Sequence, residues 1–71
     1  MNYKKFKKQI GGSHYKSMVI QPIEYINANN LKFAEGCVIK YVSRHQNKNG
    51  KEDIMKAIQN LEFILQRDYN D

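Results

Sequence analysis

A cluster of cationic side chains in the second half of the chain has the residue types and the spacing that bind phosphate. Lys40 and Arg44 are four residues apart, so on a helix they lie on one face. Arginine offers a planar fork for two phosphate oxygens, and lysine offers a compact point charge. Gly36, one helical turn earlier, lets another backbone or a ligand approach closely. The same spacing is also typical of a solvated basic face, so the pair alone leaves both alternatives open.

The segment QNKNGKED is a second candidate for phosphate binding. Its glycine-containing turn opens a helix, whose first N–H groups can bind an anion, and Lys48 and Lys51 add charge. It is not a Walker A loop, because GxxxxGK[ST] is absent. Asp53 and Glu52 are the nearest acids, and we expect them to orient Lys and Arg side chains rather than to hold Mg²⁺. Lys56 completes the cluster, although an ordinary turn with Asp53 near a helix cap explains the same residues.

Residues outside this cluster add further candidate chemistry. His14 can bind phosphate or exchange a proton near neutral pH, and Tyr15 or Tyr41 can stack on a base. A strand edge with a packed tyrosine is the alternative interpretation of His14 and Tyr15. Cys37 is the single cysteine, which excludes an intrachain disulfide and fits a reducing cytoplasm. The two histidines and this cysteine lack the spacing of a zinc finger.

Three helical segments must position these side chains. Pro22 suits the first turn of a short helix, and Asn29-Asn30 predicts its end because asparagine tolerates the left-handed conformation. The second helix is expected from about Lys32 to His45. Asn49-Gly50 is a strong turn signal, and a third helix is expected from about Lys51 to Tyr69.

Apolar periodicity predicts which side of each helix faces the core. In the second helix the inward residues are Ala34, Cys37, Val38, Tyr41 and Val42. In the third they are Ile54, Ala57, Ile58, Leu61, Ile64 and Leu65, and in the first they are Ile23, Ile26 and Tyr25.

The expected fold is mostly α: a helical hairpin plus one short helix and an extended N-terminal segment. Residues 1–13 are interpreted as a basic flexible arm and residues 14–71 as one small helical domain. A chain of 71 residues buries a modest core, and it has neither disulfides nor a metal-ligand pattern to support it. Phe63 and Ile39 lie off the core sides of their helices. We therefore expect a homo-oligomer with these two residues in its interface.

Charge and hydropathy narrow the possible partners. The formal net charge is +5, and much of the excess lies in the arm, at Lys4, Lys5, Lys7 and Lys8. The arm is either a solvated tail or a weak contact with nucleic acid. No apolar run is long enough for a membrane span, and no signal-peptide pattern follows the basic start. We expect a cytoplasmic protein.

Several motifs together resemble a known family. HYK and IQPIEYI are followed by F-x-x-G-x-x-IKYV-x-RH-x-x-KNG-x-x-DI-x-KA-x-x-x-LEFIL, and this pattern resembles the SaV-like phage domain family from about His14 to Arg67. Two positions depart from the family pattern: Cys37, where asparagine is frequent, and Asn60, where tyrosine is frequent. The signature positions carried over are His14, Tyr15, Gly36, Lys40, Tyr41, Arg44, Lys48, Gly50, Asp53, Lys56, Ala57 and Leu61.

The resemblance implies a phage or prophage protein that acts on or binds nucleotides in an infected bacterial host. Our leading hypothesis is binding of a mononucleotide, a cyclic nucleotide or a short oligonucleotide, with sequestration of a host nucleotide signal as one use. Lys40, Arg44 and Lys48 would hold phosphate, while His14 and Asp53 would orient the phosphate-binding groups. Some family members are described as nucleotide kinases, so a nucleoside monophosphate kinase using ATP and Mg²⁺ is the first alternative. A protein- or nucleic-acid-interaction module is the second.

Overall fold

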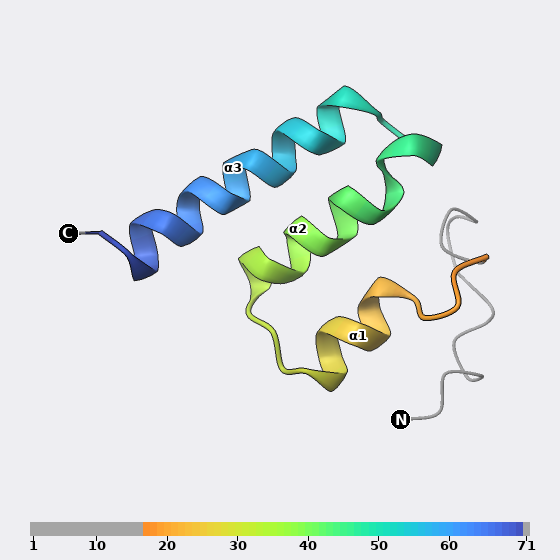
Figure 1. The fold of residues 1–71 in the computed structure, drawn as a ribbon, viewed down its shortest axis with the longest axis horizontal. Helices are drawn as coiled ribbons and strands as arrows, with labels where there is room; N and C mark the ends of the chain where they lie inside the picture. The colour runs from red at the N-terminus through yellow and green to blue at the C-terminus, as the bar shows by residue number, and fades with distance from the viewer. Residues whose placement is uncertain (1–16, 71) are drawn as a thin grey trace.

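The computed structural model describes residues 17–70, and within them all regular structure is helical. Helix α1 spans Pro22–Ala28, α2 spans Phe33–Arg44 and α3 spans Lys51–Asp68, with a short 3-10 helix, η2, at His45–Asn47 (Figure 1). The predicted mostly α fold is therefore confirmed. Residues 17–20 form a turn and bends. The predicted arm, His14 and Tyr15 lie outside the described residues.

The helix ends follow from local backbone chemistry. Pro22 occupies the first position of α1, where its missing N–H costs no hydrogen bond. Asn30 follows α1 with a φ of 54°, which is the left-handed conformation that asparagine tolerates. Gly50 precedes α3 with a φ of 56° and a ψ of −121°, a conformation that is essentially open only to glycine. Pro22, Asn30 and Gly50 thus set the helix ends that the sequence predicted.

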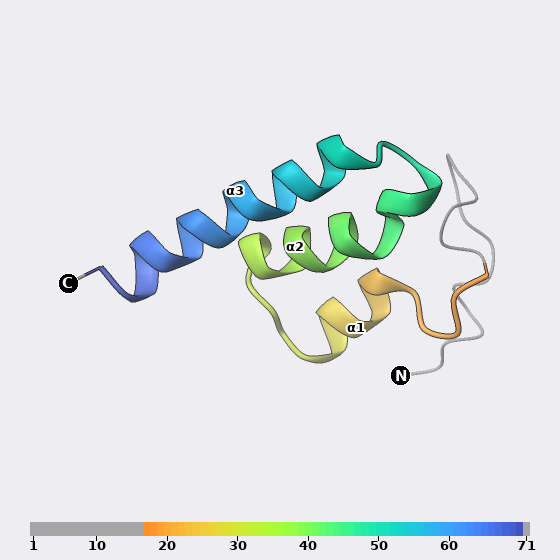
Figure 2. The same ribbon diagram turned by 45° about the horizontal axis from the view of Figure 1, so that its top comes forward.

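The three helices lie side by side in one layer, with α2 between α1 and α3 (Figures 1 and 2). Helices α2 and α3 form the predicted antiparallel hairpin. Gly36 is buried where α1 crosses α2, and a Cβ placed on it would lie 3.1 Å from Cγ2 of Ile26. The glycine therefore permits close packing of α1 on α2. No helix within residues 17–70 is long and apolar enough to cross a membrane.

The apolar core of the described residues is small, and the predicted inward faces are only partly buried. Ala34 and Ala57 are the buried apolar side chains. The prediction of burial is wrong for several larger residues because α2 covers only one edge of the α3 stripe and no other helix of residues 17–70 lies above or below the layer. The exposed members are Ile23, Tyr25, Val42, Ile58, Leu61 and Leu65.

Three polar residues are buried instead, and sequence reasoning did not anticipate the burial of Glu24 or Gln21. Asp53 is fully buried, and Glu24 is only 2% exposed. One carboxylate oxygen of Glu24, Oε2, is buried without a hydrogen-bond partner in the structure. Burial of a carboxylate is costly unless the group is paired. The two acids therefore differ in kind, since Asp53 is paired as described below.

Candidate functional site

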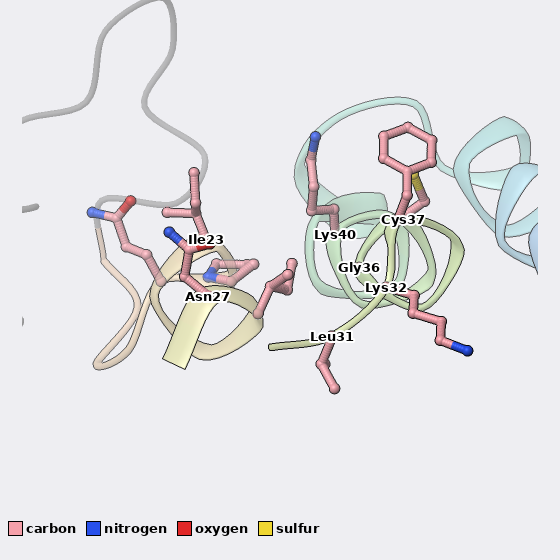
Figure 3. Close-up of a pocket in the computed structure, with 11 residues that line it drawn as sticks. Ile23, Asn27, Leu31, Lys32, Gly36, Cys37 and Lys40 are labelled. Atoms are coloured by element: carbon pink, nitrogen blue, oxygen red, sulfur yellow. The ribbon is translucent and has the colours of Figure 1, made fainter. Parts of the chain in front are cut away.

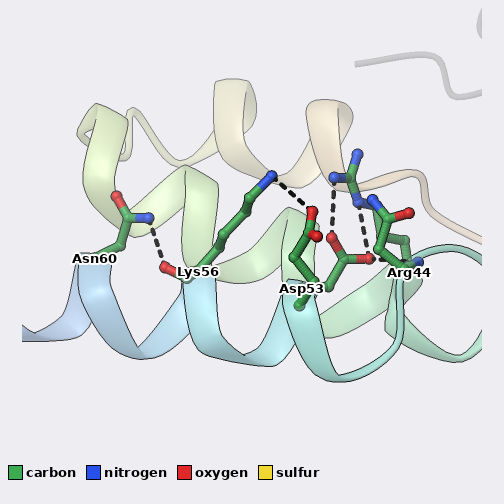
Figure 4. Close-up of polar contacts among 6 residues, drawn as sticks. Arg44, Asp53, Lys56 and Asn60 are labelled. Carbon is green, nitrogen blue, oxygen red and sulfur yellow. Dashed lines mark hydrogen bonds and ion pairs between the residues drawn. The ribbon is translucent and has the colours of Figure 1, made fainter.

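A paired arginine and aspartate join α2 to α3 beside the turn that connects them. Arg44 Nε donates to Asp53 Oδ2 over 3.3 Å, and Nη2 donates to Oδ1 over 3.1 Å (Figure 4). The backbone N–H of Asn49 donates to the same Oδ2 over 3.2 Å. Asp53 is the third residue of α3, so its carboxylate reaches back past the helix start to the turn that precedes it. The predicted orienting role of Asp53 becomes concrete here: it holds the Arg44 guanidinium and the turn together.

The electrostatics of Asp53 reflect two opposing effects. Burial raises the pKa of its carboxyl, but the hydrogen bonds from Arg44 and from Asn49 outweigh burial and hold the pKa below the ordinary value. Asp53 is therefore a carboxylate at neutral pH. Its negative charge offsets the charge of Arg44, which is mostly buried.

Tyr41 and Lys56 extend this cluster along the hairpin. The Arg44 guanidinium carbon lies 4.9 Å from the centre of the Tyr41 ring, and Lys56 Nζ lies 5.8 Å from it. Lys56 also pairs with Glu52 at 3.3 Å, and its backbone carbonyl accepts a hydrogen bond from Asn60 (Figure 4). The Tyr41 ring is thus in contact with two cations. Base stacking on this ring would require those contacts to be rearranged.

A cavity of about 630 Å³ lies between α1 and α2. Ile23 and Asn27 project from α1, and Cys37 and Lys40 project from α2 on the same side (Figure 3). Most of the lining is apolar. The full lining consists of Gln21, Pro22, Ile23, Ile26, Asn27, Leu31, Lys32, Phe33, Gly36, Cys37 and Lys40.

The structure divides the predicted site residues between two neighbouring places. Gly36 and Lys40 line the cavity. Tyr41, Arg44, Asp53 and Lys56 form the hairpin cluster. Lys48 is exposed after η2 and belongs to neither group.

Both groups nevertheless share one side of the helical layer. Lys40 and Arg44 are one turn apart on α2, and Lys56 of α3 approaches the Tyr41 ring from the same side. We call this side, which carries Lys40, Tyr41 and Lys56, the cavity face.

Sequence reasoning missed part of the cavity. Phe33 and Lys32 were not singled out, yet both line it, and Phe33 is 86% exposed. Gly36 was the only available signal, because it marked a close approach of another element without showing which one. Within residues 17–70 no three His, Cys, Asp or Glu side chains gather as metal ligands.

Comparison with known proteins places the chain in a family. The family model described as Protein of unknown function (DUF3310) matches residues 7–62. The chain belongs to this DUF3310 family. The match covers every residue of the cavity and of the hairpin cluster, and it confirms that the resemblance seen in the motifs reflects a shared domain. No curated protein and no solved structure matches the DUF3310 chain significantly.

Proposed function

We propose that this DUF3310 protein binds a nucleotide on its cavity face, with the base in the cavity and the phosphate at Lys40. The observation that carries the proposal is one mostly apolar cavity with a lysine in its wall. Its volume of about 630 Å³ lies within the range of small-molecule sites. A nucleotide matches this arrangement because it joins a flat, weakly polar base to an anionic group.

Individual side chains suit the parts of a nucleotide. Phe33 offers an exposed ring beside the cavity, and aromatic rings stack on bases with little sequence preference. Ile23 and Cys37 offer further apolar contact in the cavity wall. Lys40 and Lys32 are the two cations of the lining, and an ammonium group is a suitable point charge for phosphate.

The hairpin cluster supports this role indirectly. Arg44 is engaged by Asp53 in two hydrogen bonds, so a phosphate would compete with a buried carboxylate for the guanidinium. Lys56 adds positive charge on the same face, where it pairs with Glu52. We therefore assign direct phosphate contact to Lys40 and a mainly structural task to Arg44.

Calorimetric titration with a nucleotide panel tests the proposal. The panel holds mono-, di- and triphosphates, cyclic nucleotides and short oligonucleotides, with inorganic phosphate as a reference. Lys40→Ala should weaken binding by roughly ten- to a hundred-fold, the effect of losing a charge-assisted contact. Lys48→Ala is the matched control, because it removes the same charge outside the cavity and should leave affinity nearly unchanged.

A second pair of variants separates the base from the phosphate. Phe33→Ala should weaken nucleotides by about ten-fold or more but leave binding of inorganic phosphate unchanged. Phe63→Ala removes the other exposed phenylalanine of the described helices, away from the cavity, and should have little effect.

The same titrations distinguish the alternatives. Equal losses from Lys40→Ala and Lys48→Ala, with affinity falling steeply with salt, would indicate electrostatic nucleic-acid binding and contradict the cavity site. Incubation with a nucleoside monophosphate, ATP and Mg²⁺ tests turnover. Formation of nucleoside diphosphate would show a kinase rather than a binder.

A further inference from the structure

Within residues 17–70, an apolar stripe along α3 is left uncovered on the side of the layer opposite the cavity face. Asp53 and Ala57 are buried against α2, and Lys56 lies to one side of them, toward Tyr41. At about 100° per residue, the stripe lies on the other side of that buried line. Its members are Ile54, Ile58, Leu61 and Leu65, and we call this side the seam face.

Three of the four side chains in the stripe are exposed to solvent, and Ile54 is half-buried. Ile58, Leu61 and Leu65 are 51%, 47% and 59% exposed, and no charged residue interrupts the stripe between Ile54 and Leu65. Val42 of α2 and Tyr25 of α1 are about half exposed as well. By comparison, the apolar side chains that are buried within the described residues are the two small ones of Ala34 and Ala57. Helices usually bury such a stripe against a second layer.

The spacing of the stripe identifies what kind of surface covers it. The four residues are separated by four, three and four positions, which is the pattern of a coiled-coil seam. This spacing reads the same in both directions. An antiparallel second copy of α3, related by a two-fold axis between Ile58 and Leu61, therefore places apolar residues opposite apolar residues along the whole seam.

Charge at the two ends of the seam agrees with the same register. Lys51 lies three residues before Ile54, and Asp68 lies three residues after Leu65. In the antiparallel pair, Lys51 of one copy comes opposite Asp68 of the other, twice. Both positions are exposed at helix ends, where opposite charges attract, and Asp68 also pairs with Arg67 of its own copy.

We propose that two copies of this chain dimerise through their seam faces, with the α3 helices antiparallel and centred between Ile58 and Leu61. The second copy supplies the missing helical layer, and the two cavity faces then point outward in opposite directions. Phe63, which was expected in an interface, lies on the side of α3 away from the seam face. The centre of its ring is 5.9 Å from the guanidinium carbon of Arg67.

Sedimentation of the full chain at micromolar concentration tests the proposal with a matched pair of variants. Leu61→Asp should weaken dimerisation by more than about a hundred-fold, because it places two charges in the apolar seam. Phe63→Asp should leave the dimer intact, since that residue is on the same helix and similarly exposed, at 55% against 47%. Loss of the dimer in Phe63→Asp but not in Leu61→Asp would overturn the proposal, as would a wild-type monomer at that concentration.

A charge exchange tests the register without disturbing the seam. Lys51→Glu and Asp68→Lys should each weaken the dimer by about three- to ten-fold, since two ion pairs are lost per dimer. Both changes favour the helix dipole, and Asp68→Lys removes only an exposed contact with Arg67, so the fold is retained. The double variant should recover wild-type affinity. Weakening in the double variant that equals the product of the two single effects would exclude the antiparallel register.

Discussion

Two arginine–carboxylate bridges join α2 to α3, one near each end of the hairpin, and they differ in their surroundings. At the turn, Arg44 binds Asp53, with side chains that are 14% and 0% exposed. At the open end, Arg67 binds Glu35, with side chains that are 25% and 31% exposed. The first carboxylate also binds the turn through the Asn49 N–H, whereas Arg67 is shared with Asp68.

The comparison teaches that the same arginine–carboxylate pair can contribute much or little to the stability of a fold, depending on its burial. A buried pair that loses one partner leaves an uncompensated charge away from water, which is strongly destabilising. A partly exposed pair is screened by solvent and salt and contributes little. We therefore expect the stability of the hairpin to depend on the turn end far more than on the open end.

The largest effect is expected when the bridge at the turn is broken. Arg44→Ala strands the buried Asp53 carboxylate, and the melting temperature should fall by more than about 10 °C. Arg44→Lys should recover only part of the loss, because an ammonium group cannot reproduce the two parallel hydrogen bonds. Thermal melting followed by circular dichroism measures both variants. A shift of only a few degrees in Arg44→Ala would mean that this bridge is no stronger than the exposed one.

An intermediate effect is expected from the backbone of the same turn. Gly50→Ala forces an alanine into a φ of 56° and a ψ of −121°, at a strain of roughly 1–3 kcal/mol. The added Cβ meets no crowding, because its nearest neighbour is the His45 carbonyl oxygen at 4.0 Å. Urea unfolding would therefore measure strain alone. Unchanged stability would show that the turn relaxes and does not contribute to the strength of this end.

The smallest effect is expected at the open end, and acid should reveal it. The hydrogen bond from Arg67 holds the pKa of Glu35 below its ordinary value of 4.5, as the bonds to Asp53 hold that pKa below 3.8. A lowered folded-state pKa stabilises the fold above the ordinary pKa, and that contribution is lost as the pH falls through the folded-state value. Glu35→Gln should lower the melting temperature at pH 7 by less than about 3 °C.

The pH series compares the two bridges directly. Glu35→Gln should leave most of the acid-induced loss of stability in place, because Asp53 still protonates. Asp53→Asn should remove most of it. If the two variants flatten the acid limb equally, the bridges are equivalent and the comparison fails.

Local signals predicted the helices well, because they depend on neighbouring residues alone. Pro22, Asn30 and Gly50 set helix ends through their own backbone preferences. Burial was predicted less well, since periodicity shows that a stripe is apolar without showing which neighbour covers it. Leu61, for example, belongs to the apolar stripe of the third helix, yet it is exposed. Glu24 was missed because a carboxylate on a short helix gives no sign of burial.

The sequence predicted which cations belong to the candidate site, but it did not predict the cavity. Lys40 and Arg44 share a helical face as expected, yet Lys40 lines the cavity and Arg44 binds Asp53. The sequence could not show this division, because Asp53 comes next to Arg44 only when the hairpin is folded. The cavity depends on how closely α1 approaches α2, which no spacing in the sequence specifies. Phe33 and Lys32 became candidates only when that approach was known.

The contact between Gly36 and Ile26 gives the cavity an adjustable width. A Cβ at position 36 would lie 3.1 Å from Ile26 Cγ2, so either the Ile26 side chain must shift by a few tenths of an ångström or α1 must move away from α2. Truncation of Ile26 to alanine removes both of the closest atoms, Cγ2 and Cδ1, and would allow the two helices to move closer together. Positions 36 and 26 together therefore set the width of the cavity, and Gly36→Ala and Ile26→Ala offer a way to tune the size of ligand that it admits.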